Sequence, residues 1–232
     1  MQIILIEGMP GCGKSTLTNT LEKRLAKQDI RAQAYSELAK THPIFSLRFG
    51  DIDVHDPRYL DADLERWQIF LDRNKNDQRT YIFDAAPFQN SIRYAFEANF
   101  DDQIPIYYSK LQKLWQQTQT HAKLIYLQPE NIANHTDWCI SNKGALWAKN
   151  VSKYIESTPY AQKRDLQGVT GMKQFWNDYV YLCNALLKET RIPVKEIIST
   201  PYDWRTTKFA ENTSAFLTVN YLEESGKMSS KS

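Results

Sequence analysis

The chain has 232 residues, of which 42% are hydrophobic and 24% are charged, and its formal net charge is +2. This length suits one α/β domain with a sizeable core, and the charge is too small for a surface that coats nucleic acid, so we expect no nucleic-acid partner. No run approaches the roughly 20 apolar residues that span a bilayer, and the start lacks the basic, apolar pattern of a signal peptide. Cys12, Cys139 and Cys183 form no CxxC pair, which argues against a zinc site or a disulfide framework. These features predict a cytoplasmic protein that makes no membrane contact.

Predicted strands and helices alternate along the chain. A short apolar run over residues 2–6 is typical of a buried parallel strand, and leucines four apart over residues 14–27 predict a helix. The same reasoning predicts further strands at 30–36, 81–83, 124–127 and 194–198, helices at 57–76, 88–99, 105–119, 172–188 and 205–218, an irregular segment at 38–57 and a polar, weakly periodic segment at 131–168. The alternation indicates a five-stranded parallel sheet with helices on both faces. We expect a single domain over residues 1–222 and a disordered tail over 223–232.

The first predicted strand leads into a glycine-rich loop. Gly8-Met9-Pro10-Gly11-Cys12-Gly13-Lys14-Ser15 matches G-x-x-x-x-G-K-[ST] at every fixed position, and it lies between a strand and a helix, as the motif requires. Glycines let successive N–H groups point at phosphate oxygens, Lys14 can reach the β- and γ-phosphates, and the Ser15 hydroxyl can ligate magnesium. The residues expected to bind ATP and Mg²⁺ are Gly8, Pro10, Gly11, Cys12, Gly13, Lys14, Ser15 and Thr16. The predicted fold class is therefore α/β, a three-layer P-loop NTPase fold with a five-stranded parallel sheet and a helical lid.

Two carboxylates follow predicted strands and could complete this site. Asp84 ends the strand at 81–83, so it is a candidate catalytic, substrate-binding and metal-binding residue, with capping of the next helix as the alternative. Glu37 follows the strand at 30–36 and is a candidate base or acceptor-binding residue, with a solvated loop carboxylate as the alternative. His42, and the acidic cluster at 51–56 with His55, are weaker candidates that suit structural or solvated roles.

Cationic side chains could neutralise charge on a transferring phosphoryl group. Residues 141–168 are polar and basic, which suits a lid, and Lys143 is the first candidate there for a catalytic cation, ahead of Lys149, Lys163 and Arg164. Arg93 could bind an acceptor or a phosphate, or be an exposed helix arginine. Tyr202 or Trp204, after the last strand, could pack on a base, unless this segment begins a helix.

Several of these segments resemble the thymidylate-kinase-like group of P-loop nucleoside and nucleotide kinases. The resemblance rests on the P-loop, the segment from Phe83 to Asn90, the basic segment 141–164, the Glu37…His42-Pro43 pair and Thr158-Pro159-Tyr160, the last two suggesting a bacterial branch of the group. It implies transfer of the γ-phosphoryl group of ATP, with Asp84 at the acidic strand end and Lys143 in the lid. The chain departs from the group where Ala85-Ala86-Pro87 replaces Asp-Arg-Tyr and lysines replace lid arginines, which argues against thymidylate as the acceptor.

The residues therefore predict an ATP-dependent kinase whose small-molecule acceptor has a hydroxyl or a phosphate and resembles a nucleoside, a nucleotide or a natural product. One alternative is an NTP-hydrolysing switch that binds a macromolecular partner. Another is a kinase acting on RNA or a peptide. The sequence is compatible with a homodimer.

Overall fold

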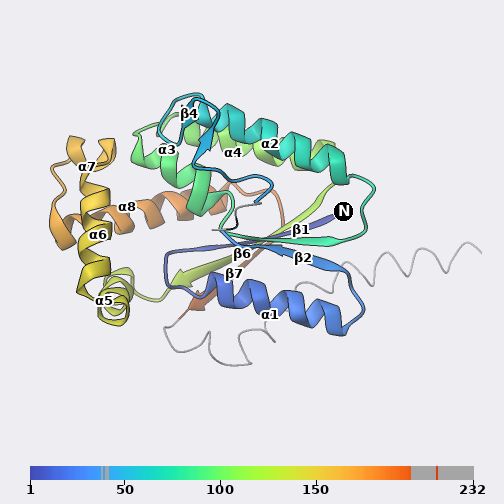
Figure 1. Ribbon diagram of the computed structural model, residues 1–232, viewed down its shortest axis with the longest axis horizontal. Helices are drawn as coiled ribbons and strands as arrows, with labels where there is room; N and C mark the ends of the chain where they lie inside the picture. The colour runs from blue at the N-terminus through green and yellow to red at the C-terminus, as the bar shows by residue number, and fades with distance from the viewer. Residues whose placement is uncertain (38, 40–41, 200–212, 214–232) are drawn as a thin grey trace, which may run out of the picture.

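The computed structural model describes residues 1–37, 39, 42–199 and 213. Within them, a parallel sheet of five strands in the order β2-β5-β1-β6-β7 forms the centre of the molecule (Figure 1). Its strands are β1 (Gln2–Gly8), β2 (Ala32–Tyr35), β5 (Thr80–Asp84), β6 (His121–Pro129) and β7 (Val194–Ser199). The predicted α/β class, strand number and parallel arrangement are confirmed.

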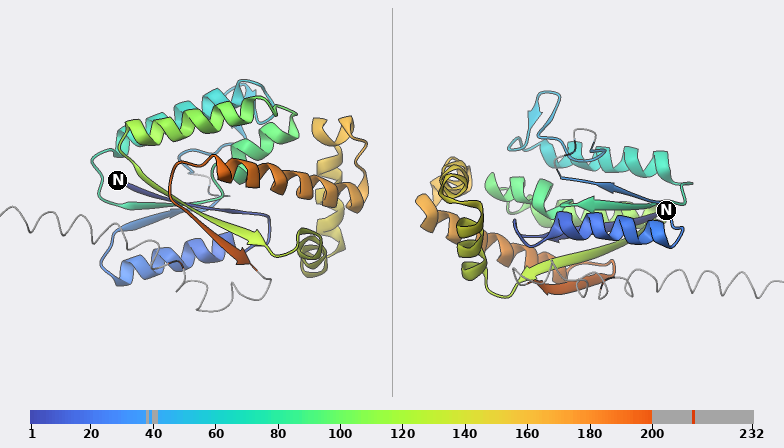
Figure 2. Two further views of the ribbon diagram at one scale, coloured as in Figure 1. Left: turned by 180° about the vertical axis from the view of Figure 1, so that it is seen from behind. Right: turned by 60° about the horizontal axis from the view of Figure 1, so that its bottom comes forward.

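Helices cover both faces of this sheet. They are α1 (Lys14–Lys27), α2 (Tyr59–Asn74), α3 (Arg93–Glu97), α4 (Gln103–Gln117), α5 (Ile132–Lys143), α6 (Ala145–Glu156), α7 (Pro159–Lys163) and α8 (Gly168–Lys188), with a π-helical turn η1 (Phe88–Ile92) before α3. In the described part of the chain, α1 lies on one face and α2, α4 and α8 on the other (Figures 1 and 2). This distribution follows from right-handed crossovers, since the chain moves one way from β1 to β2 and the opposite way afterwards.

Strand β1 lies at the centre of the sheet, and this determines where the P-loop stands. Ile3, Ile4, Leu5 and Ile6 are at most 1% exposed because neighbouring strands and helices cover both faces of β1. The register aligns Ile6 with Asp84 of β5 and Gly8 with Leu127 of β6. All five strands run in the same direction, so their carboxyl ends meet at one edge, where ligands bind in open α/β sheets.

Three segments differ in detail from the expected elements. The segment at 38–57 contains a small antiparallel hairpin, β3 (Arg48–Phe49) and β4 (Ile52–Asp53), where Gly50 turns the chain with φ of 65°. The helix expected at 88–99 begins with the π-helical turn. The weakly periodic segment at 131–168 forms α5, α6 and α7, which stand at the carboxyl end of the sheet (Figure 2).

The predicted helix at 205–218, the predicted tail at 223–232, and Tyr202 and Trp204 lie outside the described residues, apart from residue 213. No described helix is both long and apolar enough to cross a membrane.

Candidate nucleotide-binding site

The phosphate-binding motif forms a tight loop between β1 and α1. Gly8, Gly11 and Gly13 have φ of 140°, 86° and 91°, in the region that favours glycine. Gly8 also passes so close to β6 that a Cβ there would stand 2.4 Å from the carbonyl oxygen of Leu127. The free N–H groups of the first turn of α1 follow directly, and together with the loop they form an anion-binding cradle.

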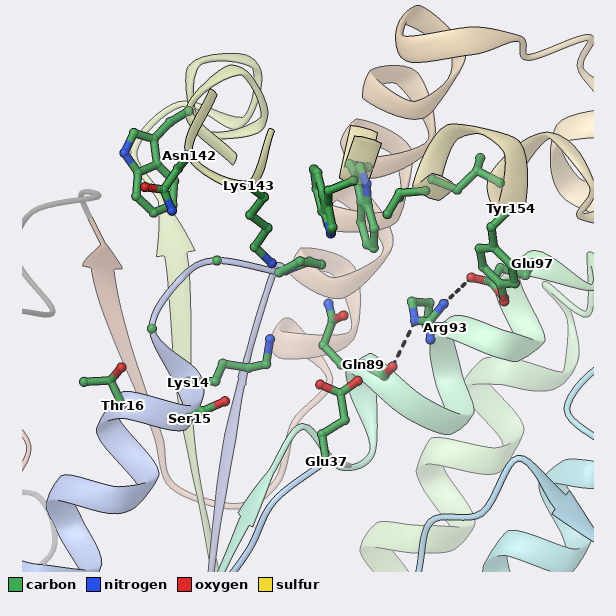
Figure 3. A pocket seen from close by; sticks show the side chains of 18 of the residues that line it. Lys14, Ser15, Thr16, Glu37, Gln89, Arg93, Glu97, Asn142, Lys143 and Tyr154 are labelled. Carbon is green, nitrogen blue, oxygen red and sulfur yellow. Dashed lines mark hydrogen bonds and ion pairs between the residues drawn. The ribbon is translucent and has the colours of Figure 1, made fainter. Parts of the chain in front are cut away.

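Lys14 lies over the loop that it follows. Its Nζ donates hydrogen bonds to the carbonyl oxygens of Gly8 (2.9 Å) and Met9 (3.2 Å), and the residue is 8% exposed. The ammonium group is therefore already at the cradle, where Figure 3 shows it pointing into the cavity. This is the position from which it can meet phosphate oxygens.

Ser15 and Asp84 form an oxygen-rich corner beside the loop. Asp84 is 1% exposed, the Ser15 hydroxyl lies close enough to lower the pKa of its carboxylate, and its Oδ1 has no hydrogen-bond partner among the described residues. A buried carboxylate oxygen without a partner is costly, and burial accordingly raises the pKa of Asp84, against the lowering effects of Ser15 and Lys14. A magnesium ion would provide the missing partner, since Mg²⁺ prefers oxygen ligands, so these residues fit the ion. The alternative of a capping role is wrong, because Pro87 holds the N-cap position and makes no side-chain cap.

A cavity of about 630 Å³ extends from this cradle between α3, α5, α6 and α8 (Figure 3). The residues lining it are Pro10, Gly11, Gly13, Lys14, Ser15, Thr16, Glu37, Gln89, Arg93, Tyr94, Glu97, Trp138, Asn142, Lys143, Trp147, Val151, Tyr154, Ile155 and Trp176. It therefore brings together the predicted site residues Lys14, Ser15, Glu37, Arg93 and Lys143.

Glu37 faces the loop from the end of β2. Burial raises its pKa, against the opposing effects of Lys14 and Arg93, which makes it a better proton acceptor than an exposed glutamate. In Figure 3 its carboxylate lies across the cavity from Lys14. Glu37 is half-buried and lines the cavity, so it is not the fully solvated loop carboxylate that was the alternative.

Arg93 is held by a buried partner that the sequence analysis did not single out. Its guanidinium pairs with Glu97, one helical turn later, and its Nε donates to the carbonyl oxygen of Gln89 at 3.0 Å. Glu97 also accepts hydrogen bonds from the Tyr154 hydroxyl of α6 at 2.6 Å and from His55 at 3.2 Å. In the sequence, the glutamate stands four residues after the arginine, which is the spacing of an ion pair on one face of a helix and could have indicated this contact.

Glu7 is the second carboxylate missed from the sequence. It is 0% exposed behind the P-loop, and its two carboxylate oxygens accept backbone N–H bonds from Phe88 (2.7 Å) and Gln89 (3.2 Å). Burial raises its pKa to about 8, although these two bonds and Lys14 act in the opposite direction. Its place at the end of an otherwise apolar predicted strand was the one feature of the sequence that could have indicated its burial. Glu7 fixes the segment after Asp84 to the strand that carries the loop.

Helix α5 packs directly on the P-loop. His135 Nε2 lies 2.9 Å from the carbonyl oxygen of Pro10 and 3.6 Å from the Sγ atoms of both Cys12 and Cys139. Both thiols are buried, which raises the pKa of Cys12 to about 12 and that of Cys139 to about 11. A thiol with a raised pKa is protonated near neutral pH, so Cys12 suits close packing beside the loop and not thiolate chemistry.

The remaining sequence candidates divide into cavity residues and residues elsewhere. Lys143 lines the cavity, and its Nζ lies 4.8 Å from the ring centre of Trp147. Lys149, Lys163 and Arg164 are exposed and do not line it, and Arg164 instead packs on Tyr160.

His42 and the acidic cluster have structural roles. The His42 Nδ1 accepts two backbone N–H bonds, and burial lowers its pKa to about 4. Asp51 and Asp56 pair with Arg58. Within the described residues, no group of three or more His, Cys, Asp or Glu side chains is arranged to hold a metal ion.

The sheet, its strand order and the loop between β1 and α1 define a P-loop NTPase fold. No protein-family model and no curated protein matches the chain. Among solved structures, the chain is similar to a deoxyadenosine kinase from M. mycoides with dCMP and dCDP bound (TM-score 0.40, 14% identity, 97% of this chain and 99% of that one). It is also similar to APE1195, with a TM-score of 0.39 and 13% identity over 81% of this chain and 95% of that one. A third similar structure is Kti12 from Chaetomium thermophilum in complex with ADP-AlF3, with a TM-score of 0.38 and 14% identity over 87% of this chain and 89% of that one.

Proposed function

We propose that this protein is an ATP-dependent phosphotransferase that moves the γ-phosphoryl group of ATP to a small molecule. The observation that carries the proposal is the cavity of about 630 Å³ that continues from the P-loop to Glu37, Arg93 and α6. A site that only hydrolyses ATP needs room for one water molecule beside the phosphates. This cavity includes the phosphate cradle and continues beyond it to Glu37, Arg93 and Tyr154, so it offers room for a small molecule beside the phosphates.

The P-loop side of the cavity would hold the donor. Backbone N–H groups of the loop and Lys14 would contact the phosphate oxygens of ATP, and Ser15 and Asp84 would hold Mg²⁺. The ion supplies positive charge that offsets the charge developing on the β- and γ-phosphates. Lys143, at the end of α5, would add a cation from the lid side.

Glu37 would act on the acceptor. Its raised pKa and its position across from Lys14 suit a base that takes the proton of an attacking hydroxyl. Arg93, fixed by Glu97, would orient the acceptor, because a guanidinium held by a buried carboxylate keeps one geometry. Closure of α5–α7 over the cavity would exclude water from the reaction.

The test is ADP release from ATP and magnesium by the purified protein, measured against a panel of nucleosides, nucleotides and hydroxylated antibiotics, with mass spectrometry of the products. We expect one class to accelerate ADP release and to become heavier by one phosphoryl group. We expect Glu37→Gln to lower that accelerated rate by about 100-fold, a typical contribution of a general base. Glu130→Gln, at an exposed glutamate outside the cavity, is the matched control.

Slow ADP release that no panel member accelerates would argue against the proposal. It would favour an NTP-hydrolysing switch or a macromolecular acceptor, and binding of ATP-loaded and ADP-loaded protein to candidate partners would then be compared.

A further inference from the structure

The cavity has walls of different chemistry. The wall contributed by α6 and α8 consists of Trp147, Val151, Tyr154, Ile155 and Trp176, and Tyr94 adds another aromatic ring from α3. The Tyr154 hydroxyl already donates to Glu97. The rest of this wall is aliphatic and aromatic surface, which gains free energy by covering an apolar ligand.

The charges around the cavity are distributed unevenly. Lys14 and Lys143 stand at the P-loop, where the triphosphate of ATP would require them. Away from the loop, the cationic group among the described lining residues is Arg93, and it is already paired with the buried carboxylate of Glu97. Another ionisable side chain that lines the cavity beyond the loop is Glu37, an acid whose carboxylate would repel a phosphate. An acceptor that carried its own phosphate would meet this carboxylate and would have to compete with Glu97 for Arg93.

From these two observations we infer that the acceptor is an uncharged alcohol with a flat, mainly apolar body. The body would lie against Trp147 and Trp176, and the hydroxyl would point to Glu37. The inference rests on the proposed phosphotransferase function and narrows its substrate class, excluding nucleoside monophosphates.

Phosphorylation of such an acceptor is a displacement at the γ-phosphorus of ATP. The hydroxyl oxygen forms a bond to the γ-phosphorus, the bond from that phosphorus to the β,γ-bridging oxygen breaks, and ADP leaves with the electron pair. The proton of the hydroxyl passes to Glu37. The products are ADP and a phosphate monoester of the alcohol.

The experiment uses calorimetric binding to the full chain in the presence of ADP and Mg²⁺. The probes are 2-naphthylmethanol, 2-naphthylmethyl phosphate, adenosine and AMP, so that each alcohol has a phosphorylated counterpart. We expect 2-naphthylmethanol to bind at least 10-fold more tightly than its phosphate and than adenosine. With ATP in place of ADP, we expect 2-naphthylmethanol to gain one phosphoryl group, detected by mass spectrometry.

Variants of α6 test the aromatic wall. Trp147→Ala is expected to weaken binding of 2-naphthylmethanol about 10-fold, and Trp147→Phe is expected to restore most of it, because the flat ring returns. Leu146→Ala is the matched control, since Leu146 is the preceding residue on α6, is 72% exposed and does not line the cavity. Circular dichroism establishes that each variant is folded.

The outcomes separate the inference from the function on which it rests. Failure of the wild type to bind ADP with Mg²⁺ would overturn the proposed function itself. If ADP binds, then tighter binding of AMP or of 2-naphthylmethyl phosphate than of the matching alcohol overturns the inference alone. Three other results would also overturn the inference alone. They are tighter binding of adenosine than of 2-naphthylmethanol, no binding of either alcohol, and equal binding of 2-naphthylmethanol by the wild type and Trp147→Ala.

Discussion

Replacing Glu7 with glutamine should change how the stability of the protein depends on pH. The side chain is 0% exposed, and burial raises its pKa from 4.5 to about 8. An acid with a raised pKa in the folded state contributes stability that is complete below pH 4.5 and is lost as pH rises through about 8. Because each pKa unit corresponds to about 1.4 kcal/mol, the whole contribution is about 5 kcal/mol, of which about 3 kcal/mol lies between pH 5.5 and 8.5.

Urea unfolding at pH 5.5 and 8.5, followed by circular dichroism, measures this contribution. Glutamine keeps an acceptor oxygen for the N–H of Phe88 but has no proton to exchange. We therefore expect the free energy of unfolding of Glu7→Gln, relative to wild type, to rise by about 3 kcal/mol between the two pH values. Glu65→Gln, at an exposed position of α2, controls for the loss of one carboxylate. Parallel pH dependence of the wild type and Glu7→Gln would refute the reasoning.

Three further predictions concern the phosphate-binding loop and the proposed magnesium site. Lys14→Ala should abolish turnover in the ADP-release assay and leave the circular dichroism spectrum unchanged, whereas Lys149→Ala, on the exposed surface of α6, should keep full activity. Asp84→Asn should lower the magnesium-dependent rate about 100-fold, and an unchanged magnesium titration would contradict the metal role. Gly8→Ala should cost about 3 kcal/mol or more in urea unfolding, because the added Cβ meets a main-chain carbonyl of β6 at 2.4 Å. Gly50→Ala, also at positive φ but with nothing within 4 Å, should cost only about 1–2 kcal/mol.

Local sequence patterns predicted most of the sheet, and also the P-loop and Asp84 at its carboxyl edge. The apolar run before Gly8 and the short run before Asp84 are visible because buried parallel strands are apolar on both faces. The motif from Gly8 to Ser15 has fixed spacing, so its residues could be named from the sequence. Asp84 could be placed because a residue that follows a parallel strand must lie at the ligand-binding edge.

Long-range packing determined what the sequence did not reveal. Glu7 and Glu97 are buried by residues from distant segments, and although each had a weak local signal, their distant partners could not be named from the sequence. The hairpin at Arg48–Asp53 has two-residue strands, which are too short for a period to be seen. The aromatic wall of the cavity could not be recognised, because Trp147 and Trp176 come from helices that meet only in the folded chain.

The close packing of α5 on the P-loop has an evolutionary consequence. A Cβ at residue 11 would stand 2.5 Å from the Sγ of Cys139, so the space that a side chain would need there is filled by another part of the chain. Position 11 is a variable position in the general motif, yet here its positive φ of 86° disfavours any side chain, and the contact with Cys139 adds a second restriction. In related chains, we expect a side chain at position 11 to occur with glycine or alanine at position 139. The two positions would then vary as a pair, although 127 residues of chain lie between them.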